Sequence, residues 1–150
     1  MMNKESMTAD AQGMVKAFHR MFQIVVHQAP TVVDERTRAL RERLIQEEFE
    51  ELKEAMAKHD LACIAKELAD LLYVVYGTAV SYGIDMNPVF REVHHSNMSK
   101  IGGYKREDGK WVKPASYSPA AIAPILAEQS SRNGQDVESL SGLQEIEQGA

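Results

Sequence analysis

The first half of the chain contains very few residues that favour turns. Before residue 83, glycine and proline occur only as Gly13, Pro30 and Gly77. Such a stretch is typical of long helices, and 150 residues are enough for one domain with a buried core. We predict helices over residues 8–27, 34–58, 60–83 and 87–98.

The ends of these helices follow from local chemistry. Pro30 disfavours helical backbone at the residue before it and so separates the first two helices. Asp60 is a suitable N-cap for the third helix, and Gly83 suits the left-handed position that ends it. Asn87 is predicted to cap the fourth helix, with the following proline at its first position. The first helix is expected to bury one apolar stripe: Met14, Val15, Phe18, Phe22 and Val25.

After these helices the sequence no longer shows a long helical pattern. Residues 104–106 and 110–112 flank a Glu-Asp-Gly turn and predict a small hairpin, and one helical turn is expected around residues 120–127. The fold class is therefore all-α, a bundle of four to five helices with a short hairpin, in one domain of residues 1–127. Residues 128–150 form a polar tail, either mobile or containing a short docking helix with regularly spaced apolar residues: Val137, Leu140, Leu143 and Ile146.

The charge balance is acidic. With 17 lysines and arginines against 22 aspartates and glutamates, the net charge is -5, which makes nucleic acid a poor partner. No secretion signal is evident, and charged residues interrupt the most apolar stretch, residues 61–84, so no membrane partner is expected. We therefore expect a cytoplasmic protein. The single cysteine, Cys63, excludes an internal disulfide and is expected to be inert packing.

Two pairs of carboxylates lie where apolar side chains are expected. At about 100° per residue, Glu48 and Glu51 fall on the same face of the second helix as Leu44. In the third helix, Glu67 and Asp70 are three residues apart and share one face. That helix is apolar on nearly all sides and is expected to be buried on nearly all sides.

These four carboxylates predict a cluster that binds cations. Ionised carboxylates in apolar surroundings are unfavourable unless cations neutralise them. Lys66 cannot do this alone, and it is expected to point about 100° away from Glu67. The alternative for the second helix is a solvated face of paired charges, formed by Glu47, Glu50, Glu54, Lys53 and Lys58.

The ligand types indicate which metal is expected. Carboxylate oxygens suit Mg²⁺ or Mn²⁺, and neither acidic motif has the histidine that a di-iron bundle uses. Mg²⁺ keeps positions open for water and bridges to phosphates. An acidic protein can therefore bind a nucleoside triphosphate through the metal.

The two acidic motifs, their order and their separation by 15 residues resemble a known signature: Glu47-Glu48-x-x-Glu51 and Glu67-x-x-Asp70. The signature is that of the all-α nucleoside triphosphate pyrophosphohydrolases, which include MazG-like proteins, dimeric dUTPases and phosphoribosyl-ATP pyrophosphohydrolases. Residues 92–100 and 107–114 are similar to segments of compact phage-type MazG-like proteins. The resemblance covers roughly residues 14–127.

The resemblance implies hydrolysis of a (deoxy)nucleoside triphosphate to the monophosphate and pyrophosphate, with Mg²⁺ or Mn²⁺ as cofactor. Glu47 would orient or deprotonate the attacking water, or ligate a further ion. Members of the family are dimers or tetramers, so a homodimer or homotetramer is expected. The implied metal ligands, which are also catalytic residues, are Glu48, Glu51, Glu67 and Asp70.

The substrate and its contacts are less constrained. The resemblance favours dGTP or GTP as the substrate, with dUTP as an alternative and phosphoribosyl-ATP as a more remote one. The rival class of function is a non-catalytic helical module that binds a nucleotide or a metal. Lys100 is expected to bind phosphates with Asn97 as an amide donor, or else to interact with the end of its helix. Lys113 belongs to a basic loop that either covers the phosphates or is solvated, and Tyr117 either stacks on the base or packs.

Overall fold

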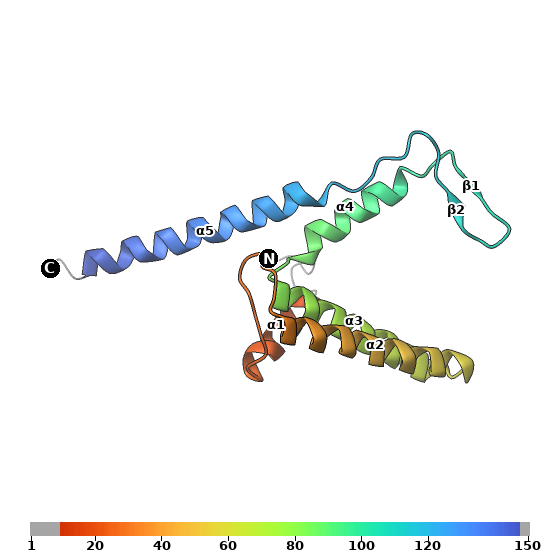
Figure 1. The fold of residues 1–150 in the computed structure, drawn as a ribbon, viewed down its shortest axis with the longest axis horizontal. Helices are drawn as coiled ribbons and strands as arrows, with labels where there is room; N and C mark the ends of the chain where they lie inside the picture. Colours follow the sequence, from red (N-terminus) through yellow and green to blue (C-terminus); the bar gives the residue numbers. More distant parts are fainter. Residues whose placement is uncertain (1–9, 148–150) are drawn as a thin grey trace, which may run out of the picture. The chain divides into compact units, whose positions relative to one another are not determined.

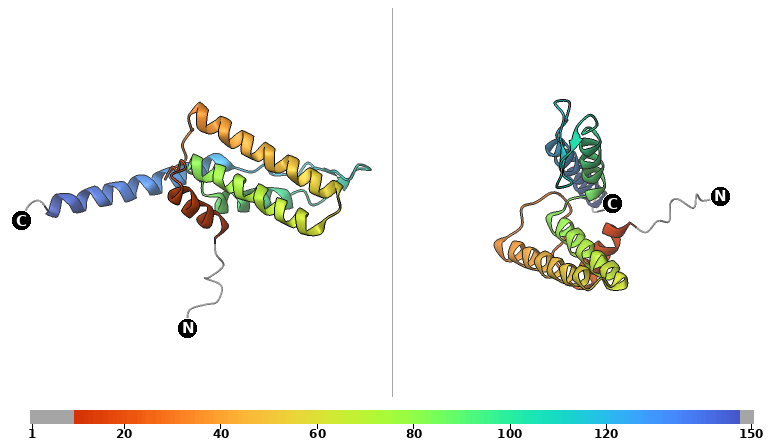
Figure 2. Two further views of the ribbon diagram at one scale, coloured as in Figure 1. Left: turned by 90° about the horizontal axis from the view of Figure 1, so that it is seen from below. Right: turned by 90° about the vertical axis from the view of Figure 1, so that its right-hand side faces the viewer.

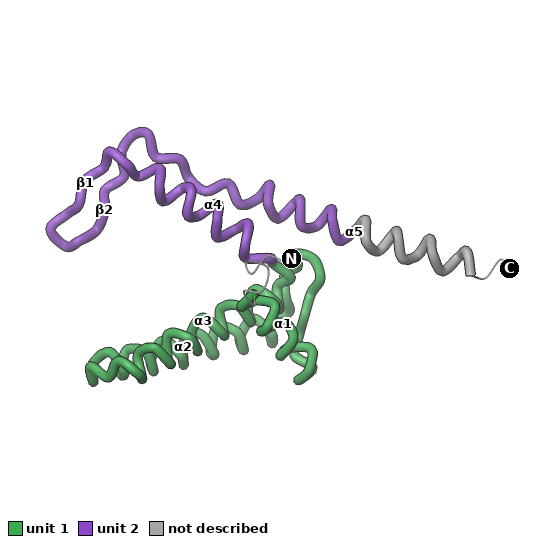
Figure 3. The backbone as a smooth tube through the Cα atoms, turned by 180° about the vertical axis from the view of Figure 1, so that it is seen from behind, with its two compact units in different colours: residues 1–84 green, residues 85–150 purple. Residues whose placement is uncertain are grey.

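A computed structural model describes residues 10–147 of the chain, with side chains up to residue 134. The chain divides into two compact units, Met1–Ile84 and Asp85–Ala150 (Figure 3), each described by itself below. Among the described residues there are five helices and one two-stranded ribbon (Figure 1), which confirms the predicted all-α class with a short hairpin. The division into a domain of residues 1–127 and a polar tail stays a prediction.

The first unit is built on two long antiparallel helices. Helix α2 spans Glu35–Ala57 and helix α3 spans Leu61–Tyr82, and the two lie side by side (Figure 2). The N–H of Thr37 donates to the side chain of Asp34 at 2.7 Å, and that of Cys63 donates to Asp60 at 3.0 Å. These bonds fix where the helices begin. Gly83, at φ 69°, ends α3 as predicted.

Helix α1 is shorter than predicted. It spans Ala11–Met21, and Gln23 then takes a positive φ of 56°. Three β-branched residues follow, which favour extended backbone. The segment after them bonds to the end of α3, where the N–H of His27 donates to the Val80 carbonyl at 3.3 Å and that of Thr31 to Tyr82 at 2.9 Å. The predicted helical continuation to residue 27 is therefore wrong.

The core of the first unit contains polar groups as well as apolar ones. Val15 on α1 is buried as predicted, but the rest of the predicted stripe is exposed, and His19 takes its place at 2% exposure. Arg41 on α2 is also buried, at 5%. The buried apolar residues among those described are Val15, Val33, Leu52, Ala55, Ala79 and Val80.

His19 and Arg41 form a buried pair beside Gly77. The ring of His19 donates through Nδ1 to the Val25 carbonyl at 3.1 Å, so Nε2 accepts from Nη1 of Arg41 at 3.3 Å. A β-carbon at Gly77 would lie 2.9 Å from Nε2 of His19 and 3.2 Å from Nη2 of Arg41. Glycine at this position therefore allows α1, α2 and α3 to approach closely.

We expect this pair to make the first unit sensitive to acid. Burial lowers the pKa of His19, and the Arg41 charge lowers it further against the opposing effect of the Val25 carbonyl. The unfolded chain therefore binds a proton before the folded one, and stability is lost as the pH falls below about 6.5. Melting temperatures measured between pH 5.5 and 7.5 should fall more for the wild type than for His19→Gln. Equal losses in both proteins would contradict this role for His19.

Helix α3 is less covered than predicted. Within the first unit α2 and α1 pack against it, but four of its large aliphatic side chains remain exposed, at 79% for Leu61, 47% for Leu68, 56% for Leu72 and 38% for Val75. Cys63, expected to be inert packing, is also exposed, in the first turn of α3. Of the helices described, none is long and apolar enough to cross a membrane.

The second unit pairs helix α4 with helix α5. Helix α4 spans Met86–Met98, and its N-cap is Asp85, whose side chain accepts the N–H of Asn87 at 2.9 Å. The prediction that Asn87 is the cap is therefore wrong. The first four N–H groups of a helix have no helical partner, so Pro88 is tolerated one turn inside. The buried side chain of Gln129 on α5 accepts the N–H of Asp85 and donates to its carbonyl, both at 3.0 Å.

The predicted hairpin is present between the two helices. Strands β1, Tyr104–Lys105, and β2, Trp111–Val112, pair antiparallel, with Tyr104 opposite Val112. Helix α5 spans Ile122–Glu147, so it is longer than the single turn predicted around residues 120–127. The predicted stripe of docking residues lies outside the described side chains: Val137, Leu140, Leu143 and Ile146.

Candidate metal centre

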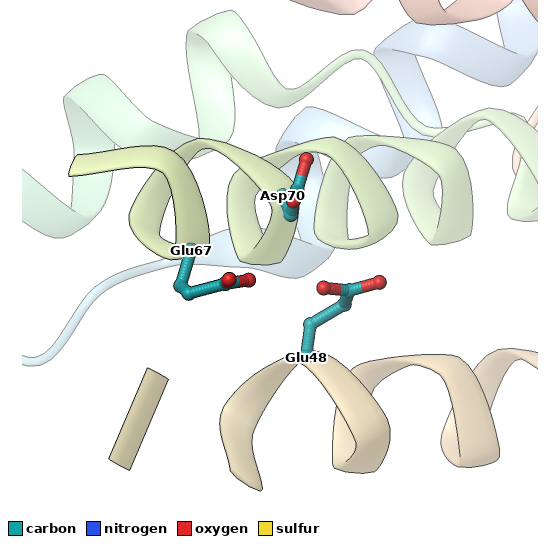
Figure 4. A group of neighbouring side chains, drawn as sticks. All are labelled: Glu48, Glu67 and Asp70. Atoms are coloured by element: carbon teal, nitrogen blue, oxygen red, sulfur yellow. The ribbon is translucent and has the colours of Figure 1, made fainter. Parts of the chain in front are cut away.

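Three of the predicted metal ligands meet between α2 and α3. Glu48 extends from α2 toward α3, which contributes Glu67 and, one turn further along, Asp70 (Figure 4). One carboxylate oxygen from each residue lies within 4.8 Å of the other two. Pairing of the two helices is thus sufficient to bring motifs far apart in the sequence into one cluster.

The cluster contains acceptors that no donor satisfies. Oε2 of Glu48 and Oε2 of Glu67 are both buried and have no hydrogen-bond partner among the described residues. The side chain of Glu67 is 12% exposed and that of Asp70 is 40% exposed. Ionised carboxylates can only accept, so buried oxygens without donors are stabilised when a cation binds them. This donor set fits a hard divalent ion such as Mg²⁺ or Mn²⁺.

Lys66 lies closer to the cluster than predicted. Its Nζ is 3.1 Å from Oε1 of Glu67 and 2.9 Å from Oδ2 of Asp70. The expectation that it points away from Glu67 is wrong, because the long lysine stem bends along the helix surface to reach both carboxylates. One ammonium still faces three carboxylates.

Burial and the crowding of like charges both act on Glu48. Burial raises the pKa of Glu48, and the charges of Glu51, Asp70 and Glu67 raise it further, whereas the Lys66 charge lowers it. The ionised form that would bind a metal is thus held at a cost in the metal-free protein.

The remaining two predicted residues of the acidic motif lie outside this group of three. Glu51 is exposed, and its charge acts on Glu48. Glu47 is exposed and lies 3.8 Å from Nε of Arg43. The buried line of α2 runs through Leu52 and Ala55, which turns Glu48 inward and leaves Glu51 at the side. Their roles as fourth ligand and water-orienting group stay predictions.

The alternative interpretation of the acidic helix applies to other residues of α2. Glu50 is exposed and pairs with Nζ of Lys53 at 2.9 Å, and Glu54 is exposed as well. One side of α2 is therefore a solvated face of charged residues, whereas Glu48 belongs to the cluster.

The four predicted substrate contacts all lie in the second unit. Nζ of Lys100 bonds to Oδ1 of Asn97 at 2.7 Å, and Nζ of Lys113 stands 4.3 Å from the ring centroid of Tyr117. The bond with Ser96 lowers the pKa of Tyr117, and the charges of Lys113 and Lys100 also lower it. These residues form a basic group around one phenol.

Ser96 is a residue of this group that sequence reasoning missed. It is 5% exposed, donates to the Ser118 carbonyl at 2.7 Å and is bonded to the Tyr117 hydroxyl at 3.2 Å. No motif or periodicity singled it out, because its partners come from a loop about 20 residues away in the sequence. The indole N–H of Trp111 donates to the Lys100 carbonyl at 2.8 Å, which gives Trp111 a structural role.

The chain matches the sequence model of a known family. The sequence model described as phosphoribosyl-ATP pyrophosphohydrolase matches residues 15–97, more than half of the chain. The matched range includes both acidic motifs and Asn97, and it ends before the hairpin. No curated protein sequence matches the chain.

Proposed function

We infer that this chain hydrolyses a nucleoside triphosphate to the monophosphate and pyrophosphate. It belongs to the phosphoribosyl-ATP pyrophosphohydrolase family, within the MazG-like all-α superfamily. The family acts on nucleotide pyrophosphate bonds. The observation that supports the reaction is the cluster of Glu48, Glu67 and Asp70, with two buried oxygens that lack donors.

The proposed cofactor is Mg²⁺ or Mn²⁺. Glu48, Glu67 and Asp70 would hold it, with Glu51 as the fourth predicted ligand beside them. A bound divalent ion supplies neutralisation of charge on the phosphates and on the leaving pyrophosphate. Glu47 is exposed on the same helix as Glu48, and its carboxylate is the proposed acceptor of a proton from the attacking water.

The second unit is proposed to bind the anionic substrate. Lys100 and Lys113 provide positive charge, and Asn97 and Tyr117 provide polar contacts beside them. Point charges of this kind bind phosphate oxygens and stabilise charge that develops in the transition state. The ring of Tyr117 is the proposed stacking surface for the base.

We propose dGTP or GTP as the substrate, on the similarity of residues 92–100 and 107–114 to phage-type MazG-like proteins. Phosphoribosyl-ATP is the second candidate, because it names the matched family. Hydrolysis of the anhydride bond between the α- and β-phosphorus atoms releases pyrophosphate from both, so one catalytic centre serves either. They differ in the base and in the phosphoribosyl group that phosphoribosyl-ATP carries on it.

Pyrophosphate release from a panel of substrates tests the proposal. The panel offers each common dNTP and NTP, dUTP and phosphoribosyl-ATP at equal concentration, with Mg²⁺, with Mn²⁺ and with a chelator. We expect release that requires the metal and is fastest with dGTP or GTP. Fastest turnover of phosphoribosyl-ATP would replace the proposed substrate but keep the reaction, whereas no release from any compound would favour a non-catalytic binding module.

We further propose that the protein is a homodimer or homotetramer. The exposed apolar side chains of α3, among them Leu61, Leu68 and Leu72, make a surface of the kind that oligomers bury. The molar mass in solution, measured by light scattering, distinguishes these states from a monomer.

A further inference from the structure

Lys66 is paired with only part of the acidic cluster. Its Nζ contacts Glu67 and Asp70, at 3.1 and 2.9 Å, which are two of the three carboxylates that approach within 4.8 Å. The third, Glu48, has a buried Oε2 with no partner in the described part of the chain. The ammonium thus offsets part of the negative charge on the α3 side of the cluster, where Oε2 of Glu67 also lacks a partner among the described residues, and it makes no ion pair on the α2 side.

The lysine does not join the two helices. Lys66, Glu67 and Asp70 all stand on α3, and the Lys66 side chain is 63% exposed. Exposed ion pairs contribute little to folding, and the flexible stem lets the ammonium move into water at small cost. The Lys66 ammonium can therefore leave the acidic cluster at a small cost in free energy.

A divalent ion and the Lys66 ammonium need the same negative charge. Two cations a few ångströms apart repel one another, and a carboxylate that is already paired is a weaker ligand. We propose that Lys66 is a built-in counter-ion of the metal-free cluster, which competes with the divalent ion and swings away when the carboxylates bind it. This inference rests on the proposed function, because it takes Glu48, Glu67 and Asp70 as metal ligands.

The change in metal affinity on removal of the Lys66 charge distinguishes a competing role from one in which Lys66 assists metal binding. If Lys66 held the carboxylates ready for a metal, removal of its charge would weaken metal binding. If it competes, removal strengthens binding, by about 3- to 30-fold for one exposed charge in this position. Lys53 offers a matched control, because it is a similarly exposed lysine that pairs with Glu50 on α2 at 2.9 Å, away from the cluster.

The experiment measures Mn²⁺ binding by the chelator-treated full chain, with no nucleotide, from the electron paramagnetic resonance signal of the free ion. We expect Lys66→Met and Lys66→Gln to bind Mn²⁺ more tightly than the wild type, Lys66→Arg to bind it as weakly as the wild type, and Lys53→Met to be unchanged. Circular dichroism verifies that each variant is folded, and two neutral replacements are included so that poor folding of one leaves the other to decide.

The possible failures are distinguishable. Wild-type binding of Mn²⁺ with equal or weaker binding by both neutral Lys66 variants would overturn the counter-ion role and leave the metal centre in place. An equal gain in Mn²⁺ affinity by Lys53→Met would show that only the net charge of the protein matters, and it would also overturn the specific role of Lys66. No Mn²⁺ binding by any of the proteins would overturn both this inference and the proposed metal centre.

Discussion

Glu48→Gln is expected to lower kcat/KM for pyrophosphate release by about 100-fold or more and, at the same time, to raise the melting temperature of the metal-free protein. The loss of activity follows from the loss of a proposed metal ligand. The gain in stability follows because a half-buried carboxylate, disfavoured by burial and by three neighbouring carboxylates, is replaced by a neutral amide that can donate to them.

Glu54→Gln is the matched control for this experiment. Glu54 stands on the same helix and is exposed, so its replacement should change neither activity nor stability appreciably. Steady-state kinetics and thermal melts in a chelator give the two quantities for both variants. Wild-type activity of Glu48→Gln at saturating Mg²⁺ would exclude Glu48 as an essential ligand, and a lower melting temperature would show that the cluster is not strained by its charge.

Lys100→Ala is expected to lower kcat/KM by roughly 10- to 1,000-fold, the range for loss of one charged phosphate contact. Mn²⁺ affinity without nucleotide should stay unchanged, because Lys100 bonds to Asn97 and not to the carboxylates of the cluster. Deletion of residues 135–150 should leave the chemistry intact, since this truncation retains Gln129 and its two bonds to Asp85. Both variants are measured side by side by kinetics and by Mn²⁺ titration.

Lys58→Ala provides the control for charge alone, since Lys58 is an exposed lysine at the C-cap of α2. A fully active Lys100→Ala protein together with an inactive truncation would show that the substrate contacts lie in the last part of the chain. A loss equal to that of Lys58→Ala would show that only the overall charge of the protein matters.

The helices of the first unit could be predicted where their ends depend on nearby residues. Asp34 and Asp60 accept N–H groups three residues ahead, and Gly83 takes the left-handed conformation that few other residues adopt. The end of α1 could not be predicted in this way. Residues after Gln23 leave the helix and bond to the end of α3, which lies more than 50 residues away in the sequence and leaves no periodic signal.

The candidate centre was predictable to the level of helix faces. The spacing of three residues predicts that Glu67 and Asp70 share one side of α3. A helical wheel of α2 centred on Leu44 predicts that Glu48 and Glu51 both lie on the buried face. In the structure, the buried face follows Leu52 and Ala55 instead. A rotation of α2 about its axis by a few tens of degrees decides whether Glu51 faces the cluster or the solvent, and packing against α3 sets that rotation. The bend of the Lys66 side chain toward two carboxylates is a choice of rotamer, which helix periodicity does not encode.

The glycine at the crossing of three helices has a consequence for how related sequences can vary. Because a β-carbon at Gly77 would meet both His19 and Arg41, the three positions are expected to change together through evolution. A relative that retains the buried histidine and arginine should retain the glycine, and one that has alanine there should have lost at least one of the two polar partners. Aligned homologues would then display Gly77 as an invariant residue of one subgroup, recognisable by the histidine and arginine that accompany it.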